Sequence, residues 1–126
     1  MKVLVAIVTY NRCALLSRCI DYVFSQTEPP DALVVINNGS TDRTLEMLND
    51  RSVCFITQQN LGAAGGWHRA IKYALDEGYD AVWLMDDDGF PDSHALEKLK
   101  KTMNPDIACS SSIVVREDSP NHFVFP

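Results

Sequence analysis

The sequence VLVAIVTYNR at residues 3–12 decides the fold class. Its first six residues are all apolar, and the next four side chains all carry hydrogen-bonding groups. An apolar run without polar alternation is typical of a strand covered on both faces, as the strands of parallel sheets are. The segment therefore predicts a buried strand whose carboxyl end opens into a polar loop.

The same pattern recurs along the chain, and segments of helical period separate its copies. Apolar residues return at helical spacing over residues 15–24, and the period is clearest over residues 67–75. Strands that alternate with helices predict the α/β class with a mostly parallel sheet flanked by helices. We expect five strands, at residues 3–9, 32–36, 53–57, 81–85 and 107–115.

The helical segments carry end signals and apolar faces. We expect Asn11 to cap the first helix and Gly78 to follow the third as its C-terminal glycine. A second, short helix follows a cap within residues 40–42, and a fourth runs from residue 92 or 93 to Pro105. The spacing predicts that these side chains of the second and third helices face the core: Leu45, Leu48, Trp67, Ala70, Ile71, Ala74 and Leu75.

Composition and charge limit the classes of function. The 126 residues include 17 acidic and 11 basic side chains, a formal charge of −6, and 46% of them are hydrophobic. This content predicts a single domain over residues 1–126, with residues 116–126 as a loop and the start of a further element. The acidic balance, without a basic cluster, gives no electrostatic footprint for nucleic acid or anionic lipid, so charge disfavours both as partners of this chain. The first apolar run is too short to span a membrane, so we expect a cytoplasmic protein.

Polar side chains follow four of the predicted strands at the point where each strand ends. Carboxyl ends of parallel strands meet at one edge of the sheet, where ligands bind in open α/β folds. The sequence therefore predicts one binding site built from four loops. These loops are residues 9–12, 37–40, 58–60 and 86–89.

The aspartate triplet is the most informative of the four loops. In extended chain, alternate side chains point the same way, so Asp86 and Asp88 can address one ligand while Asp87 points elsewhere. Two carboxylates and a substrate phosphate are a common setting for Mg²⁺ or Mn²⁺. A solvated acidic turn is the alternative, but three like charges directly after a buried strand are costly unless a cation offsets them.

A glycine-rich segment, NLGAAGG at residues 60–66, opens the third helix. Glycines allow close approach of a ligand to the backbone, and a helix N-terminus favours anions. The segment matches neither the phosphate-binding loop of NTPases nor the dinucleotide fingerprint. Arg69, one turn into the helix, is placed to reach a diphosphate or a base. A flexible turn and an ordinary exposed arginine remain the alternatives here.

Four motifs, in this order and spacing, resemble the donor-binding half of a family 2 glycosyltransferase. They are VAIVTYNR at residues 5–12, VVINNGSTD at 34–42, NLGAAGG at 60–66 and WLMDDDGFP at 83–91. The triple aspartate with the glycine-rich segment is most similar to the galactofuranosyltransferase and rhamnosyltransferase branches. The resemblance implies a GT-A fold, truncated after its donor-binding half, and a UDP- or TDP-sugar donor.

The resemblance also implies roles for individual residues. In the family, the residues that match these positions bind the nucleotide sugar or its metal. The resemblance implies that Asn37 faces the base, at a position where much of the family has aspartate. It also implies that Asp88 and Asp86 hold Mn²⁺ or Mg²⁺. The positions implied to bind the nucleotide sugar are Thr9, Tyr10, Arg12, Asn37, Asn60, Gly62, Arg69, Asp86 and Asp87.

The implied reaction is an inverting transfer to a glycan or lipid-linked acceptor, in cell-wall or surface polysaccharide synthesis. The family takes its catalytic base from sequence well after the acidic triplet, so we expect that base beyond Pro126 and assign it to no residue here. We therefore expect donor and metal binding with little or no transfer, or a binding fragment without activity. For a full-length enzyme the resemblance implies peripheral association with the inner face of the membrane. Unpaired strand edges near residues 107–115 and 123–125 predict a homo-oligomer.

Two other classes fit the sequence less well. A receiver-like signalling domain has its clustered acids after the first strand, whereas this chain has them after the fourth. A sugar-nucleotide pyrophosphorylase needs a glycine-rich, basic loop after the first strand, and Tyr10, Asn11 and Arg12 do not supply one.

Overall fold

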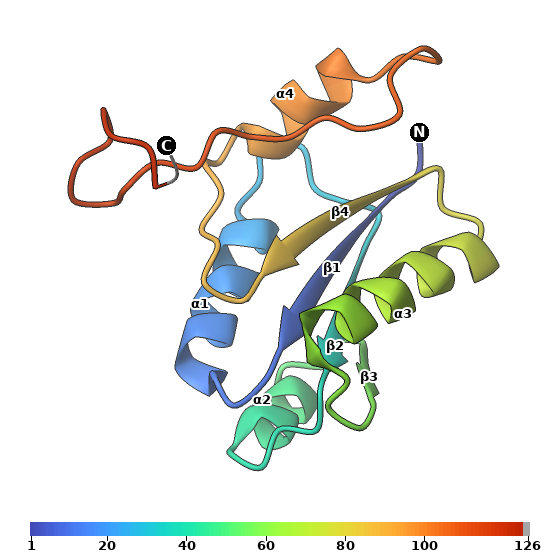
Figure 1. Ribbon diagram of the computed structural model, residues 1–126, viewed down its shortest axis with the longest axis vertical. Coiled ribbons are helices and arrows are strands. Elements are labelled where there is room, and N and C mark those ends of the chain that lie inside the picture. The colour runs from blue at the N-terminus through green and yellow to red at the C-terminus, as the bar shows by residue number, and fades with distance from the viewer. Residues whose placement is uncertain (125–126) are drawn as a thin grey trace.

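A computed structural model describes residues 1–124, which form a parallel four-stranded sheet flanked by helices (Figure 1). The strands pair in the order β3-β2-β1-β4, and all three pairings are parallel. The α/β class predicted from the sequence is therefore confirmed. The strand bounds are β1 (Val3–Thr9), β2 (Ala32–Asn37), β3 (Phe55–Thr57) and β4 (Ala81–Asp86).

Strand β1 is central to the fold because the sheet continues on both of its sides. Val5 lies opposite Leu33 of β2 and opposite Trp83 of β4. All seven residues of β1 are buried, which accounts for the unbroken apolar run in its sequence.

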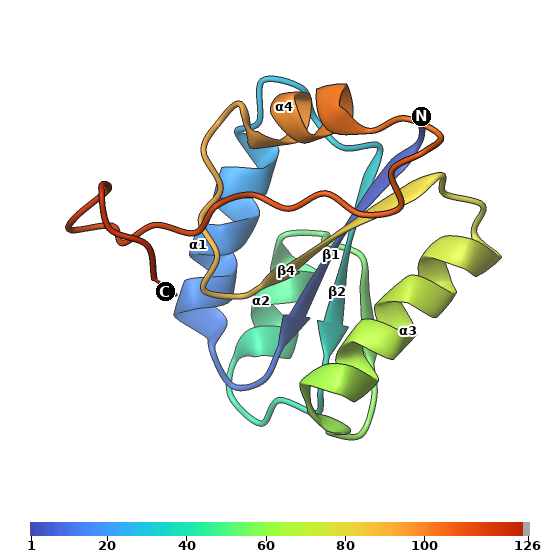
Figure 2. The same cartoon turned by 45° about the horizontal axis from the view of Figure 1, so that its top comes forward.

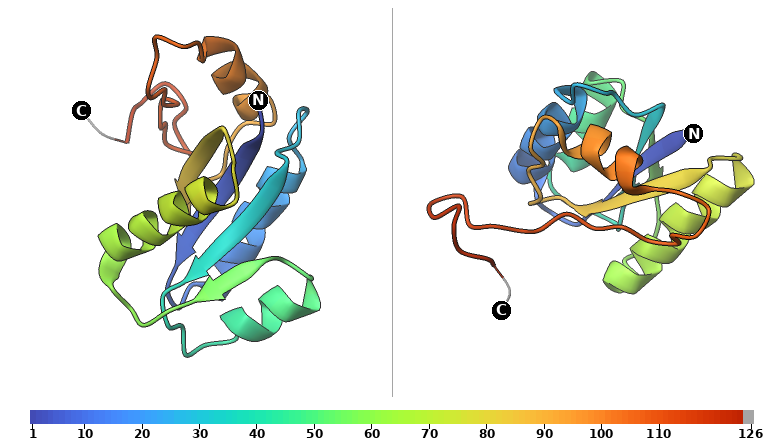
Figure 3. Two further views of the ribbon diagram at one scale, coloured as in Figure 1. Left: turned by 90° about the vertical axis from the view of Figure 1, so that its right-hand side faces the viewer. Right: turned by 90° about the horizontal axis from the view of Figure 1, so that it is seen from above.

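Helices cover both faces of the sheet, as the right-hand view of Figure 3, seen from above, shows. Helices α1 (Cys13–Phe24) and α2 (Thr44–Asp50) cover one face, and α3 (Gly62–Asp76) covers the other. Helix α4 (Ala95–Thr102) packs near the C-terminal end of α1. No helix among residues 1–124 combines the length and the apolar character needed to cross a membrane.

Alternate residues of the strands supply two separate cores. Val5 and Ile7 pack with Leu16 and Ile20 of α1 on one face of the sheet. On the opposite face, apolar residues of β1 and β2 pack with small residues of α3. The period of two along each strand produces this division. The strand residues on the α3 face are Leu4, Ala6, Val8, Val34 and Ile36.

Part of the inward face predicted for α2 and α3 is wrong. Leu48 is fully buried as expected, but Leu45, Ile71 and Leu75 are exposed. In α3, Ala70 and Ala74 are buried as predicted, and Gly66 joins them in a stripe of small residues at a spacing of four. Trp67, also predicted to face inward, is partly buried against the same core. Small side chains let the helix approach the sheet closely, and Ile71 and Leu75 lie on its outer side.

The predicted cap of α1 is also wrong. Asn11 has a positive φ of 51°, and the residue that precedes the helix is Arg12. The Asn11 side-chain oxygen instead accepts hydrogen bonds from the backbone N–H groups of Thr41 (2.7 Å) and Asp42 (3.2 Å). Asn11 therefore joins the loops after β1 and β2.

The fifth strand expected at residues 107–115 does not form. The chain after α4 runs past the sheet and projects beyond α1 (Figures 1 and 2). Its described backbone pairing is local: Val124 N–H donates to Val114 O, and Arg116 N–H donates to His122 O. Residues 116–124 form turns with one bridge, between Val115 and Phe123. Of the further element expected near the end, residues 125–126 lie outside the described residues.

Candidate functional site

A cleft of about 460 Å³ opens at the carboxyl ends of β1 and β4, facing the first turn of α3. The three aspartates form one wall, and the start of α3 with the residues before it forms the other. The loop after β1 lies between these walls. The lining residues are Val8, Thr9, Tyr10, Arg12, Asn38, Asn60, Gly62, Ala63, Asp86, Asp87 and Asp88.

The three aspartates differ in burial. Asp87 is 5% exposed, whereas Asp86 and Asp88 are exposed at the cleft surface. Asp86 is the last residue of β4, and a turn follows in which Gly89 N–H donates to Asp86 O at 3.1 Å. Two carboxylates therefore remain available to a ligand while the third enters the protein.

Two side chains of the β1 loop hold Asp87. The Thr9 hydroxyl donates to Asp87 Oδ2 at 2.9 Å, and Arg12 Nη1 lies 3.2 Å from Asp87 Oδ1. Arg12 Nη1 also lies 3.3 Å from Asp88 Oδ2. These contacts tie the ends of β1 and β4 together across the floor of the cleft.

Burial raises the pKa of Asp87, although the hydrogen bond from Thr9 and the charge of Arg12 oppose the shift. Beneath the triplet, Cys19 is fully buried and its Sγ lies 3.7 Å from Asp86 O. Burial, together with the nearby Asp87 and Asp88 carboxylates, raises the pKa of Cys19 to about 12. This thiol therefore stays protonated and has no role as a nucleophile at neutral pH.

The raised pKa of Asp87 is expected to make the protein less stable as pH rises above 3.8, the ordinary value for this carboxyl. Between 3.8 and the higher folded-state pKa, the folded chain keeps a proton that the unfolded chain has lost. The free energy of unfolding therefore decreases with pH in that window, by at most about 1.4 kcal/mol per pH unit. Urea denaturation across this window should show a steeper decrease for the wild type than for Asp87→Asn. Equal slopes in the two proteins would contradict the assignment.

Asn38 builds the opposite wall. It belongs to one of the four loops predicted to form the site, but it was not among the predicted contacts of the donor. Its Nδ2 donates to Gly62 O at 3.0 Å, and its Oδ1 accepts from Gln58 Nε2 at 2.7 Å. The alternation of side chains along β2 could have predicted this position of Asn38. Val34 and Ile36 face α3, so Asn38 follows them on the side where the glycine-rich segment begins.

Two glycines shape the start of α3. A Cβ at Gly66 would lie 2.4 Å from Val8 Cγ1, so only glycine allows this close approach of α3 to β1. Gly62 has a φ of +73°, a conformation that favours glycine, and its N–H donates to Asn60 Oδ1 at 2.9 Å. The glycine-rich sequence is therefore explained by close packing and by the turn into the helix.

Eight of the predicted site residues line the cleft, and two do not. Asn37 is buried, accepts a hydrogen bond from Ser40 N–H at 3.1 Å and donates to Thr57 Oγ1 at 3.3 Å. Arg69 is exposed on α3, outside the lining residues. Those that the structure brings together are Thr9, Tyr10, Arg12, Asn60, Gly62, Asp86, Asp87 and Asp88.

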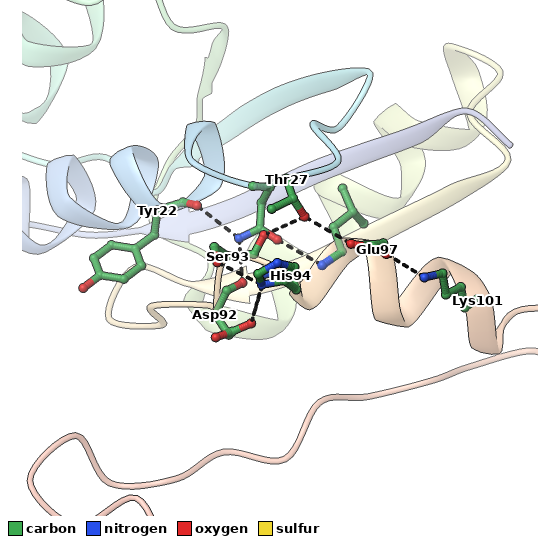
Figure 4. A network of polar contacts seen from close by, with 9 residues as sticks. Tyr22, Thr27, Asp92, Ser93, His94, Glu97 and Lys101 are labelled. Carbon is green, nitrogen blue, oxygen red and sulfur yellow. Dashed lines mark hydrogen bonds and ion pairs between the residues drawn. The ribbon is translucent and has the colours of Figure 1, made fainter.

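A buried glutamine, Gln26, fixes the far end of the acidic loop, the chain between β4 and α4, and no sequence motif pointed to it. Figure 4 shows the surrounding polar side chains, with Thr27 beside Ser93 and Glu97. Gln26 Nε2 donates to Tyr22 O (3.2 Å) and Asp92 O (2.8 Å), and its Oε1 accepts from Leu96 N–H (3.0 Å). Beside it, Thr27 N–H donates to Ser93 O at 2.8 Å. The loop that carries the triplet is therefore anchored by β4 at one end and by Gln26 at the other.

Comparison with known proteins identifies relatives over most of the chain. The model of the family "Glycosyl transferase family 2" matches residues 4–124. The chain is 34% identical to the galactofuranosyltransferase GlfT1 of Mycolicibacterium smegmatis, over 95% of this chain and 41% of that protein. It is 31% identical to the O-antigen chain rhamnosyltransferase RfbN of Salmonella typhimurium, over 79% of this chain and 32% of that protein. The chain thus spans less than half the length of these relatives.

Solved structures share the fold. The mannosyltransferase PcManGT from Pyrobaculum calidifontis, in complex with GDP-Man and Mn²⁺, has a TM-score of 0.66 at 22% identity. That match covers 82% of this chain and 33% of the mannosyltransferase. TarS of S. aureus has a TM-score of 0.64 at 23% identity, over 80% of this chain and 19% of TarS. The parallel sheet and its helices are those of a GT-A fold, and the chain belongs to glycosyl transferase family 2.

Proposed function

We propose that this chain forms the donor-binding part of a metal-dependent, inverting glycosyltransferase. The donor is a UDP- or TDP-sugar, and the acceptor is a glycan or lipid-linked saccharide of the cell wall or surface polysaccharide. The names of the relatives, a galactofuranosyltransferase and an O-antigen chain rhamnosyltransferase, support this setting. Structures of similar fold in complex with GDP-Man, UDP and UDP-GlcNAc support a nucleotide-sugar donor.

The cleft is the observation that supports this proposal most strongly. One of its walls can hold a divalent cation that neutralises a diphosphate, and the other can bind the diphosphate oxygens directly. Asp86 and Asp88 offer exposed carboxylates that a divalent cation can bridge to phosphate oxygens. Facing them, Gly62 and Ala63 open α3, a helix of 15 residues, and a helix N-terminus favours anions.

The proposed roles follow the lining of the cleft. Thr9, Tyr10 and Arg12 border the nucleotide, and Asn60 and Gly62 contact the donor from the other wall. Asp86 approaches the ribose and the sugar phosphate. Asp87, proposed from the resemblance to share that role, lies at the base of the cleft with its oxygens held by Thr9 and Arg12. Asn37 stays a proposed contact of the base. Asn38 lines the cleft, but its amide is already held by Gly62 and Gln58, so we propose that it shapes the wall. Arg69 stays a proposed contact of the diphosphate.

Mn²⁺ or Mg²⁺ fits the residues at the acidic wall. Asp86 and Asp88 supply the carboxylate oxygens that these cations prefer. Within residues 1–124, no three His, Cys, Asp or Glu side chains form a group that would hold an ion alone. Asp86 and Asp88 would hold the ion together with oxygens that the donor phosphates and water can supply. When bound, the cation stabilises the negative charge of the departing diphosphate.

A second function, donor binding without transfer, is favoured by the composition of the cleft. Inverting transfer needs a base for the acceptor hydroxyl, but the acidic side chains among the described lining residues are the three aspartates alone. We expect the 126-residue chain to release no more nucleoside diphosphate with an acceptor glycan than without it. An acceptor-dependent increase in that release would contradict donor binding without transfer.

The compartment proposed for the reaction is the cytoplasm, at the inner face of the membrane for a longer enzyme. All four cysteines have free thiols in the structure, which agrees with a reducing environment.

Calorimetric titration of UDP, TDP and GDP, in Mn²⁺ and in EDTA, tests the donor site. We expect at least one nucleotide to bind in Mn²⁺ and to bind much more weakly in EDTA. If no nucleotide binds in either condition, the proposed function is wrong.

A further inference from the structure

Arg12 neutralises the same carboxylate that the proposed cation would use. Its Nη1 atom lies 3.2 Å from Asp87 Oδ1 and 3.3 Å from Asp88 Oδ2, so one nitrogen serves two carboxylates. In the described part of the chain, Arg12 is the cation that forms ion pairs with these two aspartates. A single shared nitrogen is a weaker arrangement than a two-pronged arginine–carboxylate pair.

The two carboxylates depend on Arg12 to different degrees. Asp87 is buried and is also held by the Thr9 hydroxyl at 2.9 Å. The Asp88 side chain is 54% exposed, and Arg12 is its partner among the described contacts. The Arg12 side chain is itself 51% exposed. The contact between Arg12 and Asp88 lies at the surface, so it can open while the Thr9 hydroxyl continues to hold Asp87.

We propose that Arg12 is an exchangeable counter-ion that couples cation binding to diphosphate binding, an inference that rests on the proposed function. In the free protein, Arg12 neutralises Asp88. A divalent cation on Asp86 and Asp88 places like charge beside the guanidinium and displaces it from Asp88. Arg12 then turns to the diphosphate in the cleft, whose oxygens replace the carboxylate as its partner.

This exchange predicts cooperative binding of the two ligands. A cation alone competes with Arg12 for Asp88, and a diphosphate alone competes with Asp88 for Arg12. When both bind, each removes the competitor of the other, so the coupling is positive and has the same size in both directions. Arg12 is thus a positioning residue whose loss affects the two ligands in opposite directions.

Arg12→Met tests this opposition. Electron paramagnetic resonance measures Mn²⁺ binding without nucleotide, and calorimetry measures UDP binding at saturating Mn²⁺. We expect Mn²⁺ alone to bind about 5-fold more tightly, and UDP with Mn²⁺ to bind about 10-fold more weakly. If Arg12→Met lowers the affinity for Mn²⁺ alone as well as for UDP, while the wild type binds UDP with Mn²⁺, the counter-ion role is wrong and the proposed function stands.

Arg43→Met is the matched control, because it removes the same charge. Arg43 pairs with Glu46 on the exposed side of α2 and lines no part of the cleft. We expect neither Mn²⁺ binding nor UDP binding to change. A tighter Mn²⁺ complex in this control would attribute the effect of Arg12→Met to net charge and overturn the inference.

A second pair of variants tests the exchange without any cation. Asp88→Asn releases Arg12 from its weaker contact, whereas the same substitution in an Arg12→Met background makes the same charge change with no guanidinium to release. In EDTA, we expect Asp88→Asn to tighten UDP binding about 3-fold more in the wild-type background than in the Arg12→Met background. Equal changes in the two backgrounds would overturn the inference. A wild type that binds neither Mn²⁺ nor UDP would overturn the proposed function, and the inference with it.

Discussion

Asp88→Asn is expected to weaken Mn²⁺-dependent binding of UDP by about 100-fold. Mutating a residue that hydrogen-bonds to a metal ligand typically lowers metal affinity by about 10- to 100-fold. Removing a carboxylate that binds the metal directly should cost at least as much, so we expect about 100-fold. Asp86 would be left as the single exposed carboxylate of the triplet, since Asp87 is buried against Thr9. Calorimetric titration of UDP into each protein at saturating Mn²⁺ measures the loss.

Asp76→Asn is the control for this prediction. Asp76 is exposed on α3 and pairs with Lys72, away from the cleft, so the charge change is the same. UDP binding by this variant should equal that of the wild type. If Asp88→Asn retained wild-type affinity in Mn²⁺, Asp88 would not be a ligand of the cation.

Gln26→Ala is expected to lower the free energy of unfolding by about 3 kcal/mol. The substitution removes three hydrogen bonds and leaves the carbonyls of Tyr22 and Asp92 and the N–H of Leu96 without this partner. A buried group that loses its partner costs about 1–3 kcal/mol, and water entering the space left by the side chain limits the sum. Urea denaturation at neutral pH measures the change.

Thr27→Val separates this effect from a general loss of polar contacts. The Thr27 hydroxyl lies 3.2 Å from Ser93 O, just before α4, and 3.3 Å from Glu97 Oε2 in α4, so its one hydrogen is shared between two acceptors; the residue is exposed. Its loss should cost no more than about 0.5 kcal/mol. If the free energy of unfolding decreased by similar amounts in Gln26→Ala and Thr27→Val, Gln26 would not be a specific anchor of the acidic loop.

The parts of the fold that follow from local sequence were predictable. The apolar run before Thr9 defines the central strand, and an equally unbroken run ends at the aspartate triplet. The fifth run, at residues 107–115, is interrupted by serines at 110–112 and forms no strand, although β4 is an edge strand of the sheet. Helical spacing located α3 and placed Ala70 and Ala74 on its inner face, but it missed Gly66, whose close approach to β1 sets the packing.

The candidate site was predictable where polar residues follow strands directly. Eight of those residues line one cleft, since parallel strands end at the same edge. Asn37 and Asn38 are adjacent polar residues, and only the two faces of β2 distinguish the one in the turn from the one in the cleft. Gln26 gave no signal because its partners are backbone groups about 70 positions away in the sequence.

A crystal structure of the protein grown with UDP and Mn²⁺ would show whether the cleft is the donor site. We expect an anomalous Mn²⁺ peak between the Asp86 and Asp88 carboxylates, with the diphosphate bound between that ion and the first turn of α3. Arg12 should then contact a phosphate oxygen instead of Asp88. If the nucleotide were bound elsewhere, or the cation were held away from both carboxylates, the proposed donor site would be wrong.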